Sequence, residues 1–145
     1  MPSTVLIDTG VIVALLNRRD AFHETVSKLF IERDAGRSVP LMSTWPVVAE
    51  ACSFLPDHEQ VRVLEWLPAA GVEIVSIDAG LDFMRNMMTR YSDLPCDFAD
   101  ASLLYAAHVT RVREIWTLDR DFQVFRLPDR SRFIVVPGGL SPKTR

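Results

Sequence analysis

The chain has 145 residues, of which 48% are hydrophobic and 24% charged, and its formal net charge is −3. This length favours a single domain, residues 1–145, which can bury a core without disulfides or a structural metal. The composition excludes collagen-like and disordered classes, and the mild acidity argues against coating DNA or an anionic membrane by bulk charge. It does not exclude a local basic face.

The numbers and positions of individual residue types exclude further classes of chemistry and of protein. Only Lys28 and Lys143 are lysines, so chemistries that need a lysine have almost no candidates. Cys52 and Cys96 are too few for a disulfide scaffold and lie in apolar helical sequence, which predicts buried free thiols and a reducing cytoplasm. Asp8 splits the apolar start, which argues against a signal peptide, and no apolar stretch is long enough to span a membrane.

Short apolar strands alternate with helical segments along the chain. In chain order, the patterns predict a strand at 5–7, helices at 11–16 and 21–34, a strand at 39–42, helices at 45–55 and 56–70, a strand at 72–77, helices at 78–91 and 97–110, and strands at 115–118 and 133–136. This alternation predicts an α/β fold, a three-layer α/β/α sandwich with a mostly parallel central sheet. The polar tail 137–145 is expected to fray.

Acidic residues follow two of the predicted strands. In a parallel sheet, ligands bind outside the carboxyl ends of the strands, and Asp8 and Asp119 lie there. Asp8 could instead be a simple helix cap, and Asp119 and Asp121 could form a polar turn.

Three further acids lie in predicted helices. Glu50 stands among small apolar residues with no Lys or Arg within four positions, so it either needs a partner or faces solvent. Asp97 and Asp100, three residues apart, share a face at a helix start. Both could cap that helix, although two caps would be redundant.

Carboxylates that converge on one sheet edge repel each other unless a cation is bound. Oxygen ligands favour Mg²⁺ or Mn²⁺ over Zn²⁺, and the scattered His23, His58 and His108 have no metal-binding spacing, so they are expected to be ordinary packing or surface residues. Such a site suits phosphodiester chemistry, with a carboxylate as the best candidate to accept a proton from water.

Four motifs, in this order, resemble the PIN-domain nucleases, in particular the VapC-type toxins of bacterial toxin–antitoxin pairs. They are the segments 5–15 with Asp8, 49–50 with Glu50, 98–103 with Asp100, and 116–122 with Asp119. The four acids are separated by 42, 50 and 19 residues, and the resemblance covers nearly the whole chain.

The resemblance implies a Mg²⁺- or Mn²⁺-dependent endoribonuclease that leaves a 5′-phosphate and a 3′-hydroxyl, forms homodimers and is inhibited by a small antitoxin. It implies the catalytic residues Asp8, Glu50, Asp100 and Asp119, of which Asp8, Asp100 and Asp119 bind the metal. Thr9 and Thr117 are implied as supporting residues. Family members differ in whether Asp97 or Asp121 contributes a further ligand.

Substrate contacts are less sharply indicated. The arginines that follow elements predicted to end near the site are candidates for phosphate binding or ordinary surface residues, namely Arg18, Arg19, Arg120 and Arg126. Trp45 and Phe122 could stack on bases, although core packing is favoured for both. The helical face with Phe22, Val26 and Phe30 could be core, dimer seam or antitoxin groove, and core is favoured.

Three rival hypotheses remain. A phosphoryl-transfer domain of the haloacid-dehalogenase-like kind needs a second Asp two residues after Asp8, where Gly10 stands, and a receiver domain needs adjacent acids and a lysine. A non-enzymatic binding module of the same fold is expected to have lost one of the four acids, and none is missing. DNA in place of RNA as substrate is not distinguished by sequence, because only contacts to the 2′-hydroxyl separate the two.

Overall fold

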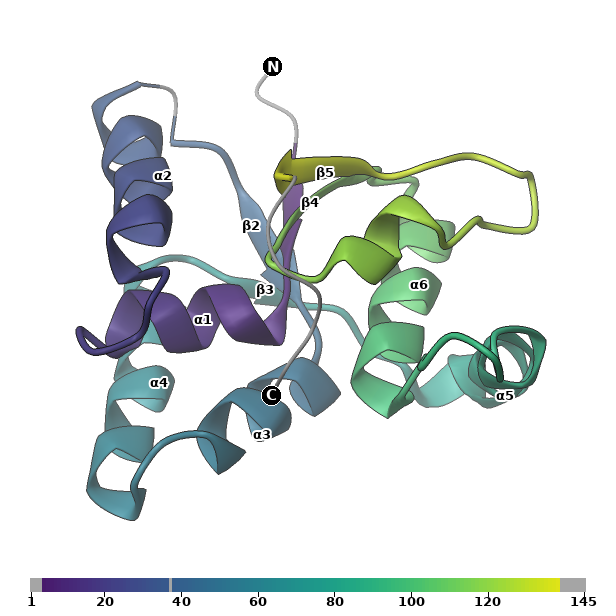
Figure 1. The fold of residues 1–145 in the computed structure, drawn as a ribbon, viewed down its shortest axis with the longest axis horizontal. Coiled ribbons are helices and arrows are strands. Elements are labelled where there is room, and N and C mark those ends of the chain that lie inside the picture. Colours follow the sequence, from purple (N-terminus) through teal and green to yellow (C-terminus); the bar gives the residue numbers. More distant parts are fainter. Residues whose placement is uncertain (1–3, 37, 139–145) are drawn as a thin grey trace.

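The computed structural model describes residues 4–36 and 38–138. Its centre is a five-stranded sheet in which every neighbouring pair is parallel, with the strand order β3-β2-β1-β4-β5 (Figure 1). The strands are β1 (Val5–Ile7), β2 (Leu41–Ser43), β3 (Glu73–Ile74), β4 (Glu114–Thr117) and β5 (Ile134–Pro137).

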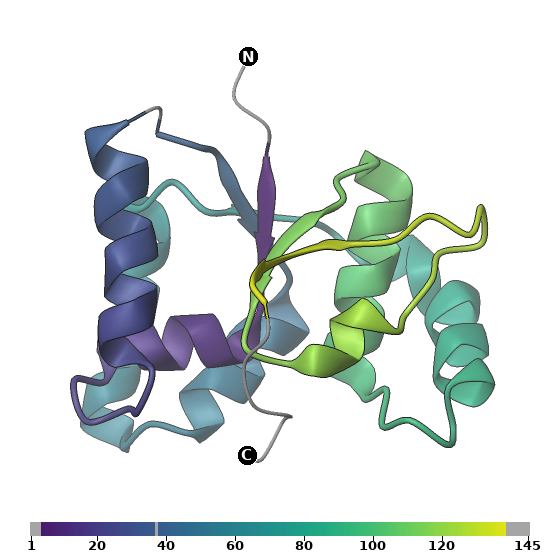
Figure 2. The same ribbon diagram turned by 45° about the horizontal axis from the view of Figure 1, so that its top comes forward.

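Helices cover both faces of this sheet. They are α1 (Thr9–Leu16), α2 (His23–Ala35), α3 (Trp45–Ser53), α4 (Asp57–Ala69), α5 (Leu81–Arg90) and α6 (Phe98–Thr110), with 3-10 turns η1 (Asp78–Gly80) and η2 (Arg120–Gln123). Figures 1 and 2 show α1, α2 and α4 on one side of the sheet and α5 and α6 on the other. The predicted three-layer α/β/α fold is therefore confirmed.

Every predicted strand and helix is present, with shifted ends. The third strand is much shorter than the predicted 72–77, because its single neighbour, β2, ends at Ser43, which is in register with Ile74. Pro137, expected to begin a frayed tail, instead belongs to β5 and is in register with Thr117 of β4. Residues 139–145 of that predicted tail lie outside the described residues.

The two helices nearest the sheet centre, α1 and α6, are buried over most of their surface for different reasons. The sequence of α1 is apolar almost all round, as expected for a helix enclosed by other elements. The buried surface of α6 is rich in small residues, which let neighbouring backbones approach closely, namely Ala99, Ala101, Ser102, Ala106 and Ala107.

The sequence left both core and binding roles open for several aromatic and apolar residues, and the structure divides them between core and surface. Val26, Phe30 and Phe122 are buried in the core, as favoured from the sequence, and Phe22 packs against it. The expectation of core packing for Trp45 is wrong, since its side chain is 57% exposed. The buried face of α3 begins two residues later, at Val47, so the first residue of the helix lies outside it.

Both cysteines are free thiols, as predicted; Cys96 is buried, and Cys52 is half-buried. Burial raises the pKa of the Cys52 thiol, so it ionises less readily than an exposed cysteine. Within residues 4–36 and 38–138, no helix has the length and apolar character needed to cross a membrane.

Gly80 allows a close approach between η1 and α6. A Cβ atom at this position would lie 2.8 Å from three ring carbons of Tyr105. We therefore expect Gly80→Ala to lower the free energy of unfolding by roughly 1–3 kcal/mol, the usual cost of overpacking, in a urea titration. In a Tyr105→Ala background the same substitution should cost much less; an equal loss in both backgrounds would contradict the steric explanation.

Candidate metal centre

The candidate site lies between β1 and β4, where successive strands stop being added to one side of the sheet and are added to the other. From β1 the chain first adds β2 and β3 on one side, and later adds β4 and β5 on the other. The carboxyl ends of β1 and β4 therefore border a topological switch point, where ligands bind in open α/β sheets. Asp8 directly follows β1, and a single residue, Leu118, separates the end of β4 from Asp119.

A chain of hydrogen bonds holds the Asp8 carboxylate at this edge. The Asp119 backbone N–H donates to Thr117 Oγ1 at 2.9 Å, and the Thr117 hydroxyl donates to Asp8 Oδ2 at 2.7 Å. Because the hydroxyl oxygen accepts from an N–H, its own proton is directed to the carboxylate. The Thr9 N–H donates to Asp8 Oδ1 at 2.7 Å, so both residues predicted to support the site contact Asp8.

Asp100 reaches the same place from the opposite layer. It lies in the first turn of α6, where Asp97 is the N-cap. The Asp100 N–H donates to Asp97 Oδ1 at 2.8 Å, and the Asp97 N–H donates to Asp100 Oδ2 at 3.2 Å, a reciprocal capping box. Sequence reasoning treated two caps as redundant, whereas the structure uses both acids in one capping arrangement.

Asp8, Asp100 and Asp119 form a compact cluster, which we call the acid triad. One carboxylate oxygen from each lies within 4.8 Å of the other two, and the three side chains are no more than 5% exposed. Each carboxylate oxygen has two lone pairs, so the capping hydrogen bonds leave acceptor capacity for a cation. Three buried oxygen donors at this separation fit a hard divalent cation such as Mg²⁺ or Mn²⁺.

The remaining predicted acids lie outside this group among the described residues. Asp97 serves as the α6 cap, and the Asp121 N–H donates to Asp119 Oδ1 at 2.9 Å within η2. Glu50 is half-buried on α3, one helical turn after Val47. The structure thus brings together three of the six candidate acids.

The start of α3 is fixed against the helices that carry Asp8 and Asp100. Thr44, the α3 N-cap, and Ser102 of α6 share a hydrogen bond of 2.6 Å between their hydroxyl oxygens. The Thr9 hydroxyl donates to the Val47 carbonyl at 3.5 Å, a long contact. The sequence predicted a hydroxyl cap from Ser43 or Thr44 at this helix start, but it connected neither Thr44 nor Ser102 with the site. Buried hydroxyls in otherwise apolar or small-residue segments were the available signal.

The four candidate arginines differ in exposure and in their position relative to the acid triad. Arg120 is exposed and directly follows Asp119. Arg18 and Arg19 are exposed but follow the far end of α1, which begins beside Asp8 and is about 12 Å long at 1.5 Å per residue. Arg126 is half-buried, and its Nη1 donates to three backbone carbonyls at the end of η2. Arg18 and Arg19 are therefore separated from Asp8 by the length of α1.

The histidines stand apart from the acid triad, as expected of ordinary packing and surface residues. His23 Nδ1 lies 2.7 Å from the Ala14 carbonyl, and the His108 ring stacks on Phe83 with centroids 4.7 Å apart. His58 is exposed on α4.

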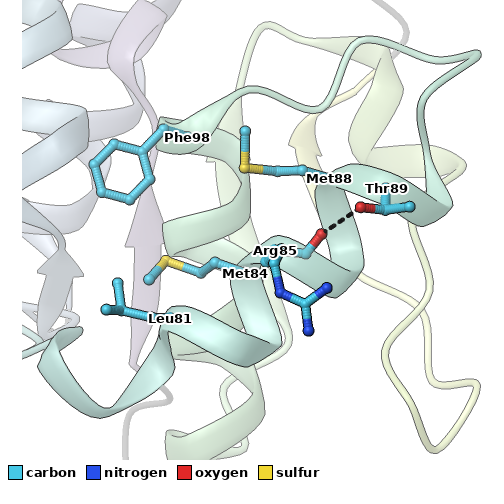
Figure 3. A pocket seen from close by; sticks show the side chains of 6 residues that line it. All are labelled: Leu81, Met84, Arg85, Met88, Thr89 and Phe98. Atoms are coloured by element: carbon cyan, nitrogen blue, oxygen red, sulfur yellow. Dashed lines mark hydrogen bonds between the residues drawn. The ribbon is translucent and has the colours of Figure 1, made fainter.

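An apolar groove of about 390 Å³ lies between α5 and the start of α6 (Figure 3). Its lining consists of Leu81, Met84, Arg85, Met88, Thr89 and Phe98. Leu81, Met84 and Met88 share this face of α5, but only Met84 is buried. Phe98, the first residue of α6, supplies the aromatic wall of this groove.

Comparisons with known proteins agree with this architecture. The family model of the PIN domain matches residues 5–126, a range that includes all four predicted catalytic acids. Among solved structures, Mycobacterium tuberculosis VapC20, described as a toxin that cleaves the sarcin–ricin loop, is similar with a TM-score of 0.64 and 18% sequence identity. The match covers 77% of this chain and 86% of that one, and it establishes a shared fold. The search of curated proteins found no match.

The acid triad predicts a specific link between cation binding and stability. Mn²⁺ should raise the thermal midpoint of the wild-type protein, with about 2.7 kcal/mol of stabilisation at 100 times the dissociation constant. Asp100→Asn removes one of three mutually repelling charges, so it should be at least as stable as wild type without metal and gain little from Mn²⁺. Differential scanning fluorimetry measures both.

The exposed Asp93, in the turn before α6, provides a matched control. Asp93→Asn should respond to Mn²⁺ as wild type does. An equal Mn²⁺ response in Asp100→Asn and wild type would contradict a cation site at the acid triad.

Proposed function

This chain belongs to the PIN-domain family, and we propose that it is a divalent-metal-dependent endoribonuclease that hydrolyses RNA phosphodiester bonds, as a VapC-type toxin does. The observation that carries the proposal is the acid triad, because three buried carboxylates at a topological switch point could hold a divalent cation suited to phosphate chemistry. The similarity to VapC20, a toxin that cleaves RNA at the sarcin–ricin loop by its description, supports RNA as the substrate class.

Asp8, Asp100 and Asp119 are the residues that would hold Mg²⁺ or Mn²⁺. A divalent cation held there supplies positive charge that orients a phosphodiester and offsets the charge developing on the leaving oxygen. The hydrogen bonds from Thr117 and Thr9 keep the Asp8 carboxylate in a fixed orientation before substrate arrives. Preorganised ligands of this kind avoid a reorganisation cost during the reaction.

We assign Glu50 as the residue that accepts a proton from the attacking water. It lies outside the acid triad, one helical turn after Val47, whose carbonyl accepts a hydrogen bond from Thr9 beside Asp8. No histidine belongs to the acid triad, so a carboxylate is the best available base. Asp97, which caps α6, and Asp121, whose backbone N–H donates to Asp119, would support the ligands and not bind the cation directly.

Arg120 is the arginine we assign to phosphate binding, because it is exposed and adjacent to Asp119. Arg18, at the far end of α1, would contact RNA only well away from the cut. The proposal includes a homodimer, a small antitoxin as partner and a cytoplasmic location, all of which follow from the likeness to VapC-type toxins.

The proposal predicts metal-dependent cutting of RNA. Purified protein should cleave RNA with Mg²⁺ or Mn²⁺, stop when EDTA is added, and leave 5′-phosphate ends. Asp8→Asn and Asp100→Asn should abolish cleavage while keeping the fold, because each removes a charge but little volume. Gel analysis of labelled RNA, with circular dichroism for the fold, measures this; full activity in either variant would overturn the site, and cleavage of DNA alone would overturn the substrate class.

Glu50 can be separated from the metal ligands by a second experiment. Glu50→Gln should lower kcat by about 10²–10⁴-fold, the usual contribution of a general base, while the Mn²⁺-induced rise in thermal midpoint persists. Glu65→Gln, an exposed glutamate on α4, should change neither quantity. Loss of Mn²⁺ stabilisation in Glu50→Gln would instead identify Glu50 as a metal ligand.

A further inference from the structure

Trp45 is an unusual residue to leave in solvent. Its indole is 57% exposed at the first position of α3, whereas Trp116 is buried and Trp66 packs against the core. An exposed side chain of this size leaves a large apolar area in water, and exposed aromatic residues beside a site commonly mark binding. The core explanation for Trp45, the obvious one from sequence, is excluded by its exposure.

Two contacts of its neighbours hold the start of α3, which carries Trp45, against residues close in sequence to Asp8 and Asp100. Thr44, its neighbour in sequence, forms the 2.6 Å hydroxyl contact with Ser102, which lies two residues after Asp100. Val47, two residues beyond Trp45, accepts a hydrogen bond from Thr9, which adjoins Asp8. The backbone of Trp45 therefore lies between two residues, Thr44 and Val47, that form hydrogen bonds to α6 and to the start of α1.

A second exposed aromatic side chain lies at the first position of α6, the helix that carries Asp100. Phe98 is 49% exposed at the first position of α6, two residues before Asp100, and Figure 3 shows its ring at the edge of the groove along α5. The first residues of α3 and α6 thus both present aromatic rings to solvent. Every base has an aromatic face, so such rings bind unpaired bases with little dependence on sequence.

We propose that Trp45 is a base-stacking residue, which holds an unpaired base of the RNA next to the phosphodiester at the acid triad. The inference rests on the proposed function and requires an unpaired base, because bases in a duplex are already stacked on each other. A phosphate placed at the acid triad brings its flanking bases to the rim where Trp45 lies.

The test measures RNA binding in an Asp8→Asn background, which leaves the RNA intact. A short oligoadenylate should quench the tryptophan emission, whereas a duplex of oligoadenylate with oligouridylate should not. Adding Trp45→Ala should weaken oligoadenylate binding by roughly 5- to 150-fold and remove most of the quenching. Trp45→Phe should restore most of the affinity, because it keeps an aromatic ring.

Ile31→Ala serves as the matched control, since Ile31 is 66% exposed on α2 and has no part in the site. It should leave oligoadenylate affinity unchanged. In otherwise wild-type protein, Trp45→Ala should raise KM for single-stranded RNA with little change in kcat, as expected for a residue that binds substrate without entering the chemistry.

The outcomes separate this inference from the proposed function. If the wild-type protein cuts RNA but Trp45→Ala binds oligoadenylate as tightly as its parent, base stacking is wrong. If Trp45→Ala alters only the sedimentation mass of the protein, the indole belongs to a protein interface and base stacking is equally wrong. If no RNA is cut but oligoadenylate still quenches Trp45, the nuclease proposal fails while the stacking inference stands.

Discussion

The mutual repulsion of Asp8, Asp100 and Asp119 is the constraint on which the site depends. Their carboxylates are buried within 4.8 Å of one another, and each also caps a helical element, α1, α6 or η2. The positive ends of these elements therefore converge where the negative charges gather, which offsets part of the repulsion. A divalent cation would offset the remainder, so the arrangement is that of a protein built to hold one.

The fold supplies this convergence through its topology. Reversal of strand order between β1 and β4 places Asp8 and Asp119 on adjacent strands, and α6 brings Asp100 from the opposite layer. The small residues of α6 allow α3 to approach, and the contact between Thr44 and Ser102 fixes that approach. Core packing and site geometry are thus determined by the same helices, and changes in α6 should affect both.

Sequence patterns predicted the element order, the parallel sheet and the acids that meet at its edge, because strand alternation and burial leave direct signals in residue type. Residue patterns alone did not separate Asp100 from Asp97 and Asp121, which look alike as caps or ligands. The resemblance to the PIN-domain nucleases implied Asp8, Asp100 and Asp119 as ligands, and these are the three that the structure brings together. The exposure of Trp45 was also missed, because an aromatic residue at a helix start has no neighbours in the sequence that reveal which way it faces.

The central claim is that the acid triad binds one divalent cation as a unit. Crystals of the protein soaked in Mn²⁺, with anomalous diffraction recorded near the manganese edge, test it most directly. The account predicts an anomalous peak within bonding distance of carboxylate oxygens from Asp8, Asp100 and Asp119, absent from Asp100→Asn crystals. A soaked wild-type crystal with no peak at these residues, or with its peak elsewhere, would contradict it.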